Sequence, residues 1–302
     1  MRYDIPILLI MFNRPEMALQ VFSRIRLARP KTLYLTVDGP RLDRATDEKD
    51  VLACQSIERY VDWPCTVKTL YRTENLGCKR AVSSAITWFF EQVEMGIILE
   101  DDCLPDLTFF DYCQVLLNKY ALDPKIMHVG GANIYENHKW GSDSYFFSTI
   151  PHIWGWATWR RAWLVYDVTM KDYPLFKRSK YIKEIVTGLP SLSYWLKIFD
   201  ETYLGNIDTW DYQWVFAIWK NEGISIIPNQ NLITNIGFGE LATHTLSESG
   251  FANLPTVPME IKDIKHPLEV SLNKEAINFA FTKFFSSTSW WGKFKSIRYM
   301  LS

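Results

Sequence analysis

Short apolar runs alternate with amphipathic stretches over the first 130 residues of the chain. Residues 7–11, 33–37, 66–71 and 96–99 have the length and the apolar or β-branched character of strands. The stretches between them carry apolar residues at a helical period. Strands and helices that alternate in this way predict an α/β fold, with a largely parallel sheet and helices on both of its faces.

Helices are predicted between these strands. Asn13 is expected to cap the first helix, with Pro15 in its first turn. Further helices are expected at about 47–60 and 78–94, and another begins near residue 106. The first three helices would therefore connect consecutive strands.

The pattern changes after residue 130. Residues 130–133, with the sequence Gly-Gly-Ala-Asn, are expected to form a flexible connection, and residues 154–163 are rich in tryptophan. The other predicted elements are helices at 179–187 and 191–204, a helix that opens at 208–214, and strands at 224–227 and 232–236. A chain of 302 residues is long enough for one large α/β domain or two smaller ones.

Three consecutive carboxylates, Glu100, Asp101 and Asp102, directly follow the apolar run at 96–99. Adjacent carboxylates repel one another, so three unpaired ones at a strand end cost stability. A hard divalent cation such as Mg²⁺ or Mn²⁺ removes this cost, and such ions bind one or two carboxylates together with substrate phosphates. The alternative interpretation is an acidic turn exposed to solvent.

The predicted topology brings other polar residues to this triplet. In a parallel sheet with right-handed crossovers, the loops after residues 11, 37 and 99 lie along one edge. Asn13, Arg14 and Asp38 stand in the first two of these loops. We therefore expect them to line one crevice with the triplet, at the carboxyl ends of the strands, where open α/β sheets bind ligands.

Composition narrows the class of protein. The formal net charge of -1 gives no electrostatic reason to expect a nucleic-acid partner. The five cysteines are scattered without a C-x-x-C pair, which indicates a reducing compartment and no structural zinc. The apolar run at 5–12 is too short for a signal peptide or a membrane span, so a cytoplasmic location is expected. The 13 tryptophans fit a large core and also fit stacking on sugar rings.

Five motifs in a fixed order give the chain a resemblance to a known group. They are Asn13-Arg14-Pro15, Val37-Asp38, the acidic triplet with Pro105 and Phe109-Phe110, Ile153-Trp154-Gly155-Trp156, and Trp210-Asp211. Over residues 5–240 the chain resembles nucleotide-diphospho-sugar transferases of the GT-A fold, which is Rossmann-like. The likeness is to the N-acetylglucosaminyltransferase I type of inverting glycosyltransferase and its bacterial relatives.

The resemblance implies roles on the donor side of the site. Asp102 would hold a Mn²⁺ or Mg²⁺ ion that bridges to the donor diphosphate, Asp101 would lie near the ribose, and Glu100 would lie near the donor sugar. The other donor-binding residues would be Arg14 near the phosphates, Asp38 at the nucleotide or the donor sugar, and Asn13.

On the acceptor side, the resemblance implies that Asp211 is the catalytic base that deprotonates the acceptor hydroxyl. The neighbouring Trp210 would shield it from water. A carboxylate placed at a helix N-terminus because of the helix dipole is the alternative interpretation of Asp211. Asp208 is the alternative base.

Four further residues are candidates for the site. His244 stands in a loop beside two threonines, where it either reaches the diphosphate or the metal or is structural. Arg160 and Arg161 either bind phosphate or cap a tryptophan-rich helix. Trp156 is a candidate because it belongs to the Ile-Trp-Gly-Trp motif.

These roles divide the chain into three parts. Residues 1–130 are expected to form the nucleotide-sugar-binding half, 131–250 the acceptor-binding and catalytic-base half of the same GT-A domain, and 251–302 a helical C-terminal extension. The implied activity is inverting, metal-dependent transfer of a sugar, with UDP-GlcNAc as the first candidate donor. The acceptor would be a hydroxyl of a glycan or lipid-linked saccharide in bacterial surface polysaccharide synthesis.

Two other functions stay open. A sugar nucleotidyltransferase is expected to carry a glycine-rich, basic loop after the first strand, where this chain has Asn-Arg-Pro-Glu at 13–16. A non-catalytic carbohydrate-binding protein would explain the tryptophans but not the acidic triplet.

The C-terminal residues 276–302 contain no acidic residue and interleave lysines and an arginine with aromatic residues. A basic aromatic segment suits the surface of an anionic membrane, and we expect residues from about 288 onward to anchor the protein peripherally at the inner leaflet. The alternative is a helix packed on the catalytic domain, because Ile277, Phe281, Phe284 and Phe285 also fit a core-facing stripe.

Overall fold

The fold is described from a computed structural model, in which residues 3–135, 138–238 and 253–286 are described. Its centre is one sheet of 8 strands in the order β3-β2-β1-β4-β8-β6-β9-β7. The strands are β1 (Ile7–Met11), β2 (Thr32–Val37), β3 (Thr66–Tyr71), β4 (Met95–Glu100), β6 (Ile126–Gly130), β7 (Tyr145–Ser148), β8 (Trp156–Trp159) and β9 (Ile224–Pro228).

The sheet is mostly parallel. β1 pairs in parallel with β2 and with β4, and β2 pairs in parallel with β3. β8 runs antiparallel to both β4 and β6, and β7 runs antiparallel to β9. The α/β class with a largely parallel sheet, predicted from the alternation of strands and helices, is therefore confirmed, and the fold is Rossmann-like.

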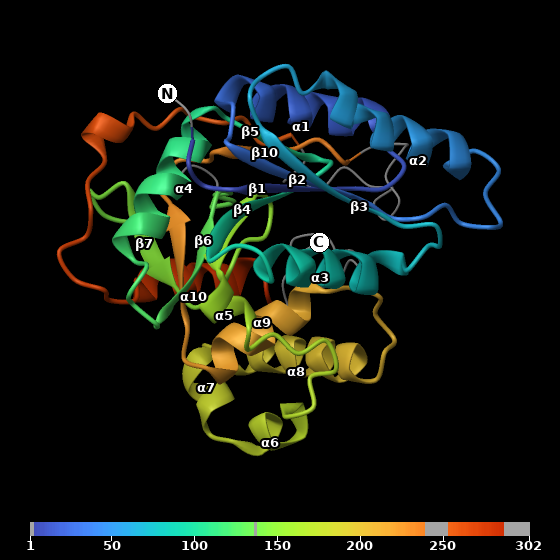
Figure 1. The fold of residues 1–302 in the computed structure, drawn as a ribbon. Coiled ribbons are helices and arrows are strands. Elements are labelled where there is room, and N and C mark those ends of the chain that lie inside the picture. Colours follow the sequence, from blue (N-terminus) through green and yellow to red (C-terminus); the bar gives the residue numbers. More distant parts are fainter. Residues whose placement is uncertain (1–2, 136–137, 239–252, 287–302) are drawn as a thin grey trace.

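Helices cover both faces of the sheet (Figure 1). α1 (Pro15–Ala28) and α2 (Asp47–Gln55) lie over one face, and α3 (Gly77–Phe90) lies under the other. α1 buries Ala18, Val21, Phe22 and Ile25, which are spaced at the helical period that the sequence shows. α4 (Thr108–Lys119) packs against β4, β6 and β8.

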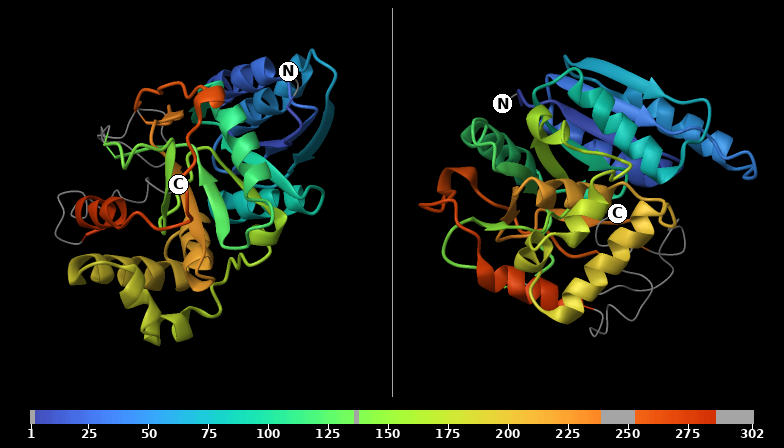
Figure 2. Two further views of the ribbon diagram at one scale, coloured as in Figure 1. Left: turned by 90° about the vertical axis from the view of Figure 1, so that its left-hand side faces the viewer. Right: turned by 90° about the horizontal axis from the view of Figure 1, so that it is seen from below.

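A second group of helices projects from one end of the sheet, as Figure 2 shows from two further sides. It consists of α5 (Arg160–Trp163), α6 (Tyr173–Arg178), α7 (Tyr181–Ile185), α8 (Leu189–Tyr203) and α9 (Asp211–Lys220). The predicted helices at 179–187, 191–204 and 208–214 correspond to α7, α8 and the start of α9. Aromatic side chains join α8 to α9, since Trp195 and Phe199 both lie in ring contact with Trp219.

Tryptophans from β8, α5 and α9 form a core cluster at the junction of the sheet with these helices. The Trp156 ring stacks on Trp210 with centroids 5.6 Å apart, and Trp163 and Trp214 pack around the same pair. Trp156, Trp210 and Trp214 are fully buried. These rings therefore serve packing and offer no exposed face on which a sugar could stack.

Three details differ from the sequence-based expectations. Residues 130–133 are not a flexible connection, because Gly130 ends β6 and the Gly131 N–H donates to the Gly155 carbonyl at 2.8 Å. Asn13 does not cap α1; its side-chain amide donates instead to Asp47 at 2.9 Å. β6, β7 and β8 were not predicted, since their short runs carry no alternation that separates them from loops.

The described part of the C-terminal segment packs on the core. α10 (Lys274–Lys283) is capped by Asn273, whose side chain accepts from the Ala276 N–H at 2.9 Å. Ile277, Phe281, Phe284 and Phe285 are buried, so the core-facing stripe is confirmed for these residues. The expected membrane anchor, from about 288 onward, lies outside the described residues. No helix in the described ranges has the length and apolar character needed to cross a bilayer.

Candidate active site

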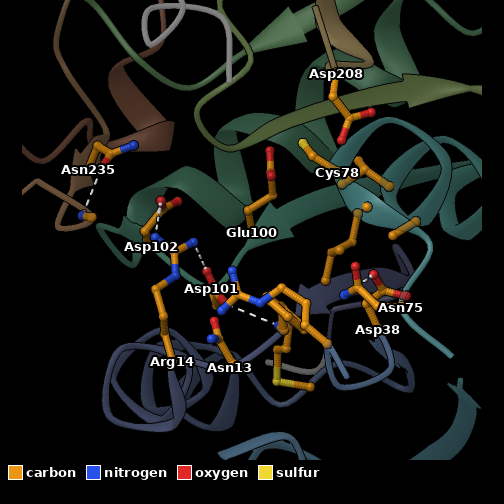
Figure 3. Close-up of a pocket in the computed structure, with 18 of the residues that line it drawn as sticks. Asn13, Arg14, Asp38, Asn75, Cys78, Glu100, Asp101, Asp102, Asp208 and Asn235 are labelled. Carbon is orange, nitrogen blue, oxygen red and sulfur yellow. Dashed lines mark hydrogen bonds and ion pairs between the residues drawn. The ribbon is translucent and has the colours of Figure 1, made fainter. Parts of the chain in front are cut away.

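The order of the strands creates a crevice beside β1. β2 flanks β1 on one side and β4 flanks it on the other, so the chain leaves the carboxyl ends of β1 and β4 in opposite directions. A cavity of about 310 Å³ opens there. Asn13, Arg14 and Asp38 line this cavity together with the acidic triplet, which confirms the predicted convergence (Figure 3).

Asp101 and Asp102 form the turn between β4 and the short strand β5 (Cys103–Pro105). Asp101 is 2% exposed, and its carboxylate accepts from the Phe12 N–H at 3.2 Å. The Asp102 side chain is 17% exposed and faces the cavity. The two neighbouring carboxylates thus differ: one is held inside the protein and the other is accessible to a ligand.

Arg14 provides the positive charge that the triplet needs. Its guanidinium forms an ion pair with Asp101 and a second one with Asp102, with Nη1 3.0 Å from Oδ2 of Asp102. Burial alone would lower the pKa of Arg14, but the two carboxylates outweigh it and raise that pKa, so the guanidinium stays protonated. One arginine therefore faces three acids.

Glu100 is the acid that remains unpaired. No described residue donates a hydrogen bond to its side chain or forms an ion pair with it, and its carboxylate points into the cavity (Figure 3). Burial and the neighbouring charges of Asp102 and Asp101 raise the pKa of Glu100 well above its usual range. A cation bound at this position would relieve that repulsion.

The loop after β10 (Ile233–Asn235) closes over the triplet. β10 pairs with β5, and the Ile236 N–H donates to the Asp102 carbonyl at 2.9 Å. A Cβ atom at Gly237 would lie 2.3 Å from Oδ2 of Asp102 and 3.0 Å from Nη1 of Arg14. Only glycine therefore lets this backbone pass so close to the pair.

The far end of the cavity is built around Asp38 and Arg41. Asp38 accepts from the Asn75 side chain at 3.0 Å and from the Leu76 N–H at 3.1 Å. Burial raises the pKa of Asp38, and the hydrogen bond from Leu76 opposes that rise. Arg41 lies over the Phe12 ring, 5.1 Å from its centroid, and donates to the buried Asp47. This end therefore offers a flat aromatic and cationic surface beside fixed polar groups.

Asp208 and Asp211 occupy different environments. Asp208 is exposed and lines the cavity, where its carboxylate packs against the bare backbone of Gly77; a Cβ there would lie 2.9 Å from Oδ2. Asp211 is fully buried at the start of α9, does not line the cavity, and accepts a hydrogen bond from the Thr209 hydroxyl. The structure thus presents Asp208, the alternative base, to the cavity and encloses Asp211, whose role as base stays a prediction.

The two arginines of α5 lie away from the cavity. β8 runs antiparallel to β4, with Trp159 opposite Met95, so Arg160 and Arg161 sit at the end of the sheet opposite the triplet. Arg160 donates to the Val93 carbonyl at 3.1 Å, and Arg161 donates to the Ile126 carbonyl at 2.9 Å. Both cap backbone carbonyls, so a phosphate-binding role in this site is wrong. His244 lies outside the described residues.

The donor set fits a cation that arrives with its ligand. No group of three His, Cys, Asp or Glu side chains is arranged as a metal site within the ranges that the structure describes. Asp102 is accessible and Glu100 is unpaired, and two carboxylates are enough for Mg²⁺ or Mn²⁺ when substrate phosphates and water complete the coordination. The residues present therefore suit an ion shared with a phosphorylated ligand.

Asp211 gives a prediction about stability. Burial raises its pKa to about 7, against hydrogen bonds from Thr209 and the backbone that lower it. Between the pKa that Asp211 has in the unfolded chain and about pH 7, the unfolded chain has lost the carboxyl proton of Asp211 and the folded protein keeps it. The free energy of unfolding therefore falls as pH rises through this window.

We expect Asp211→Asn to remove this loss, because the amide stays neutral. The variant should be more stable than wild type at pH 8, by on the order of 1 to 3 kcal/mol, and no more stable at pH 4. Urea unfolding of both proteins across this pH range measures the difference. A difference that does not change with pH would contradict it.

Some residues of the cavity were not identified from the sequence. Arg41, Asn75 and Phe238 all line it. Phe238 and Asn235 come to it through the pairing of β10 with β5, which no local pattern in either segment indicates. Asn75 precedes Leu76 and Gly77, which has a positive φ, directly before a helix. This polar turn could have identified Asn75 as a candidate from the sequence.

Comparisons with known proteins identify no family. No protein-family model matches the chain, and no curated protein matches it in sequence. Among solved structures, the chain is similar to 4-diphosphocytidyl-2C-methyl-D-erythritol synthase from Anaerococcus prevotii, with 10% identity and a TM-score of 0.32 over 72% of this chain and 99% of that chain. It is also similar to a UDP-glucose pyrophosphorylase complexed with UDP-glucose, with 9% identity and a TM-score of 0.28 over 48% of this chain and 62% of that one. At these TM-scores neither likeness carries an argument about the activity of this chain.

Proposed function

We propose that the protein binds a nucleotide-diphospho-sugar together with Mn²⁺ or Mg²⁺ and transfers the sugar to an acceptor hydroxyl with inversion. The observation that carries the proposal is the acidic turn after β4, which opens into a cavity at the point where the strand order reverses. Asp102 faces the cavity there, and Glu100 has no partner among the described residues.

The residues of the cavity suit the two ends of such a donor. Asp102 and Glu100 would hold the cation, which neutralises charge on the leaving diphosphate when it is bound. Arg14 lies beside them as a fixed positive charge. At the far end, Phe12 and Arg41 provide a flat surface of the kind on which a nucleobase stacks. Asp38 lines the same cavity.

Asp208 is the residue that we assign as base. An inverting displacement needs a carboxylate on the side of the sugar opposite the leaving group, within hydrogen-bond reach of the acceptor hydroxyl. Asp208 lines the cavity on the α3 side, away from Asp102 (Figure 3). Asp211 lies behind this surface and would act as base only if its carboxylate became exposed when the acceptor binds.

Sugar nucleotidyl transfer is the second candidate. The connection after β1 favours glycosyl transfer, because β1 ends at Met11 and α1 begins at Pro15. The residues between them include no glycine, and their one arginine is already paired with Asp101 and Asp102, so they offer little to wrap a triphosphate.

Product analysis separates the two candidates. The full chain is incubated with Mn²⁺ and UDP-GlcNAc, with and without saccharide acceptors, and in parallel with UTP and a sugar 1-phosphate. Release of UDP supports glycosyl transfer, and release of pyrophosphate supports nucleotidyl transfer. Calorimetry with UDP, with and without Mn²⁺, tests whether the nucleotide binds together with the ion, which both candidate functions require. Glycan binding that is unaffected by metal, without UDP binding, would overturn both in favour of a carbohydrate-binding protein.

A further inference from the structure

The ion pairs of Arg14 occupy the position that a cation would need. Arg14 bridges Asp101 and Asp102 and is thereby the positive charge that balances the triplet in the protein alone. A divalent ion bound at Asp102 would have to share Oδ2, the oxygen that already accepts a hydrogen bond from Nη1 of Arg14 at 3.0 Å. Arginine and cation therefore compete for one side chain.

The two halves of this bridge are unequal. Asp101 is 2% exposed and is also held by the Phe12 N–H, so its pair with Arg14 lies inside the protein. The Asp102 side chain is 17% exposed and faces the cavity. The backbone at Gly237 lies against the Arg14–Asp102 pair and carries no side chain there. The contact with Asp102 is thus the one that can open.

We propose that Arg14 is a positioning residue that blocks Asp102 against a cation alone and releases it when a cation arrives with a diphosphate. The inference rests on the proposed donor site. A free cation that displaced Arg14 from Asp102 would leave one guanidinium arm unpaired in a poorly solvated cavity, which is costly. A diphosphate supplies that arm with a new anionic partner, since guanidinium binds phosphate oxygens well.

The consequence is that cation and nucleotide bind cooperatively. The cation takes Asp102 from Arg14, and the diphosphate gives the freed arm of Arg14 a new partner. Each ligand therefore raises the affinity of the protein for the other. The protein without nucleotide should bind Mn²⁺ weakly although three carboxylates lie together. The nucleotide should bind poorly without the ion.

Titration of the nucleotide-free full chain with MnCl₂, followed by calorimetry or by the signal of free Mn²⁺ in electron paramagnetic resonance, tests this directly. We expect Arg14→Gln to bind Mn²⁺ at least about tenfold more tightly than wild type, the size expected when a charged hydrogen-bonding competitor is removed. The matched control is Arg26→Gln. Arg26 also lies on α1 and pairs with an aspartate, Asp62, but it is exposed and does not line the cavity.

A second measurement records how much UDP improves Mn²⁺ affinity. This improvement should be large in wild type and in Arg26→Gln and small in Arg14→Gln. Equal Mn²⁺ affinities of wild type and Arg14→Gln would overturn the proposal, and so would an equal gain in both variants, because loss of any positive charge would then explain it.

Circular dichroism checks that Arg14→Gln folds, since the variant leaves the buried Asp101 without its cation. If it does not fold, Arg14→Lys decides, because lysine keeps the charge and cannot bridge both carboxylates in the same way. Tighter Mn²⁺ binding than wild type then supports the proposal, and unchanged affinity overturns it. The Mn²⁺ titration uses no nucleotide, so a failure of wild type to bind UDP would be recognised separately as a failure of the proposed function.

Discussion

Asp102→Asn should lose about 100-fold or more of the UDP affinity that depends on Mn²⁺, because an amide replaces the one accessible carboxylate of the turn. The free energy of unfolding should change little. Arg14 keeps its pair with Asp101, and the Asp102 side chain is only partly buried. Calorimetry with UDP at saturating Mn²⁺ measures the effect.

The control for this variant is UDP affinity in the presence of EDTA, which should not fall below that of wild type, because no bound ion is then lost. Thermal unfolding of both proteins shows whether the fold is intact. If Asp102→Asn keeps the full gain in UDP affinity on addition of Mn²⁺, the ion does not bind through this residue. Glu100 is then the next carboxylate to examine, because it also faces the cavity.

Asp208→Asn should reduce turnover by about 10²- to 10⁴-fold, the usual contribution of a general base, while donor affinity is nearly unchanged. The reason is positional: Asp208 lines the cavity, and Asp211 is enclosed by the protein. We expect Asp211→Asn to keep turnover within about tenfold of wild type, since its carboxylate does not reach the cavity. Release of UDP from UDP-GlcNAc at saturating acceptor measures both variants.

The two variants serve as controls for each other, because each removes one carboxylate from the same short segment. If Asp211→Asn loses turnover and Asp208→Asn keeps it, the base is the buried residue, and acceptor binding must open the start of α9. Equally small losses of turnover in both variants would indicate that the base lies outside residues 208–211.

Much of the nucleotide-side half could be predicted from sequence. The strands at 7–11 and 66–71 have the predicted bounds, and those at 33–37 and 96–99 are found within one residue at each end, because each is a short run bounded by polar turns. The convergence of Arg14, Asp38 and the triplet followed from the handedness of parallel crossovers alone. The antiparallel strand β8 did not, since its tryptophans gave no period that distinguishes a strand from a helix.

The site was less predictable than the fold, because its details depend on contacts between distant segments. The sequence placed Arg14 near the triplet but gave no reason to pair it with Asp101 and Asp102 at once. The resemblance favoured Asp211 over Asp208 as base. Which of the two carboxylates is buried depends on the segments that pack over them, and no local pattern shows this. Gly237 stood out only when its distance to Asp102 was known.

The pairing of β10 with β5 has a consequence for the order in which the protein is made. A ribosome releases the acidic turn long before it releases Ile233–Asn235, whose strand holds β5 from the other side. β4 likewise waits for its neighbour β8, which is synthesised later. The nascent chain can thus pair β1 with β2 and β4 early. The strands that pack around its acidic turn are complete only when most of the polypeptide has emerged.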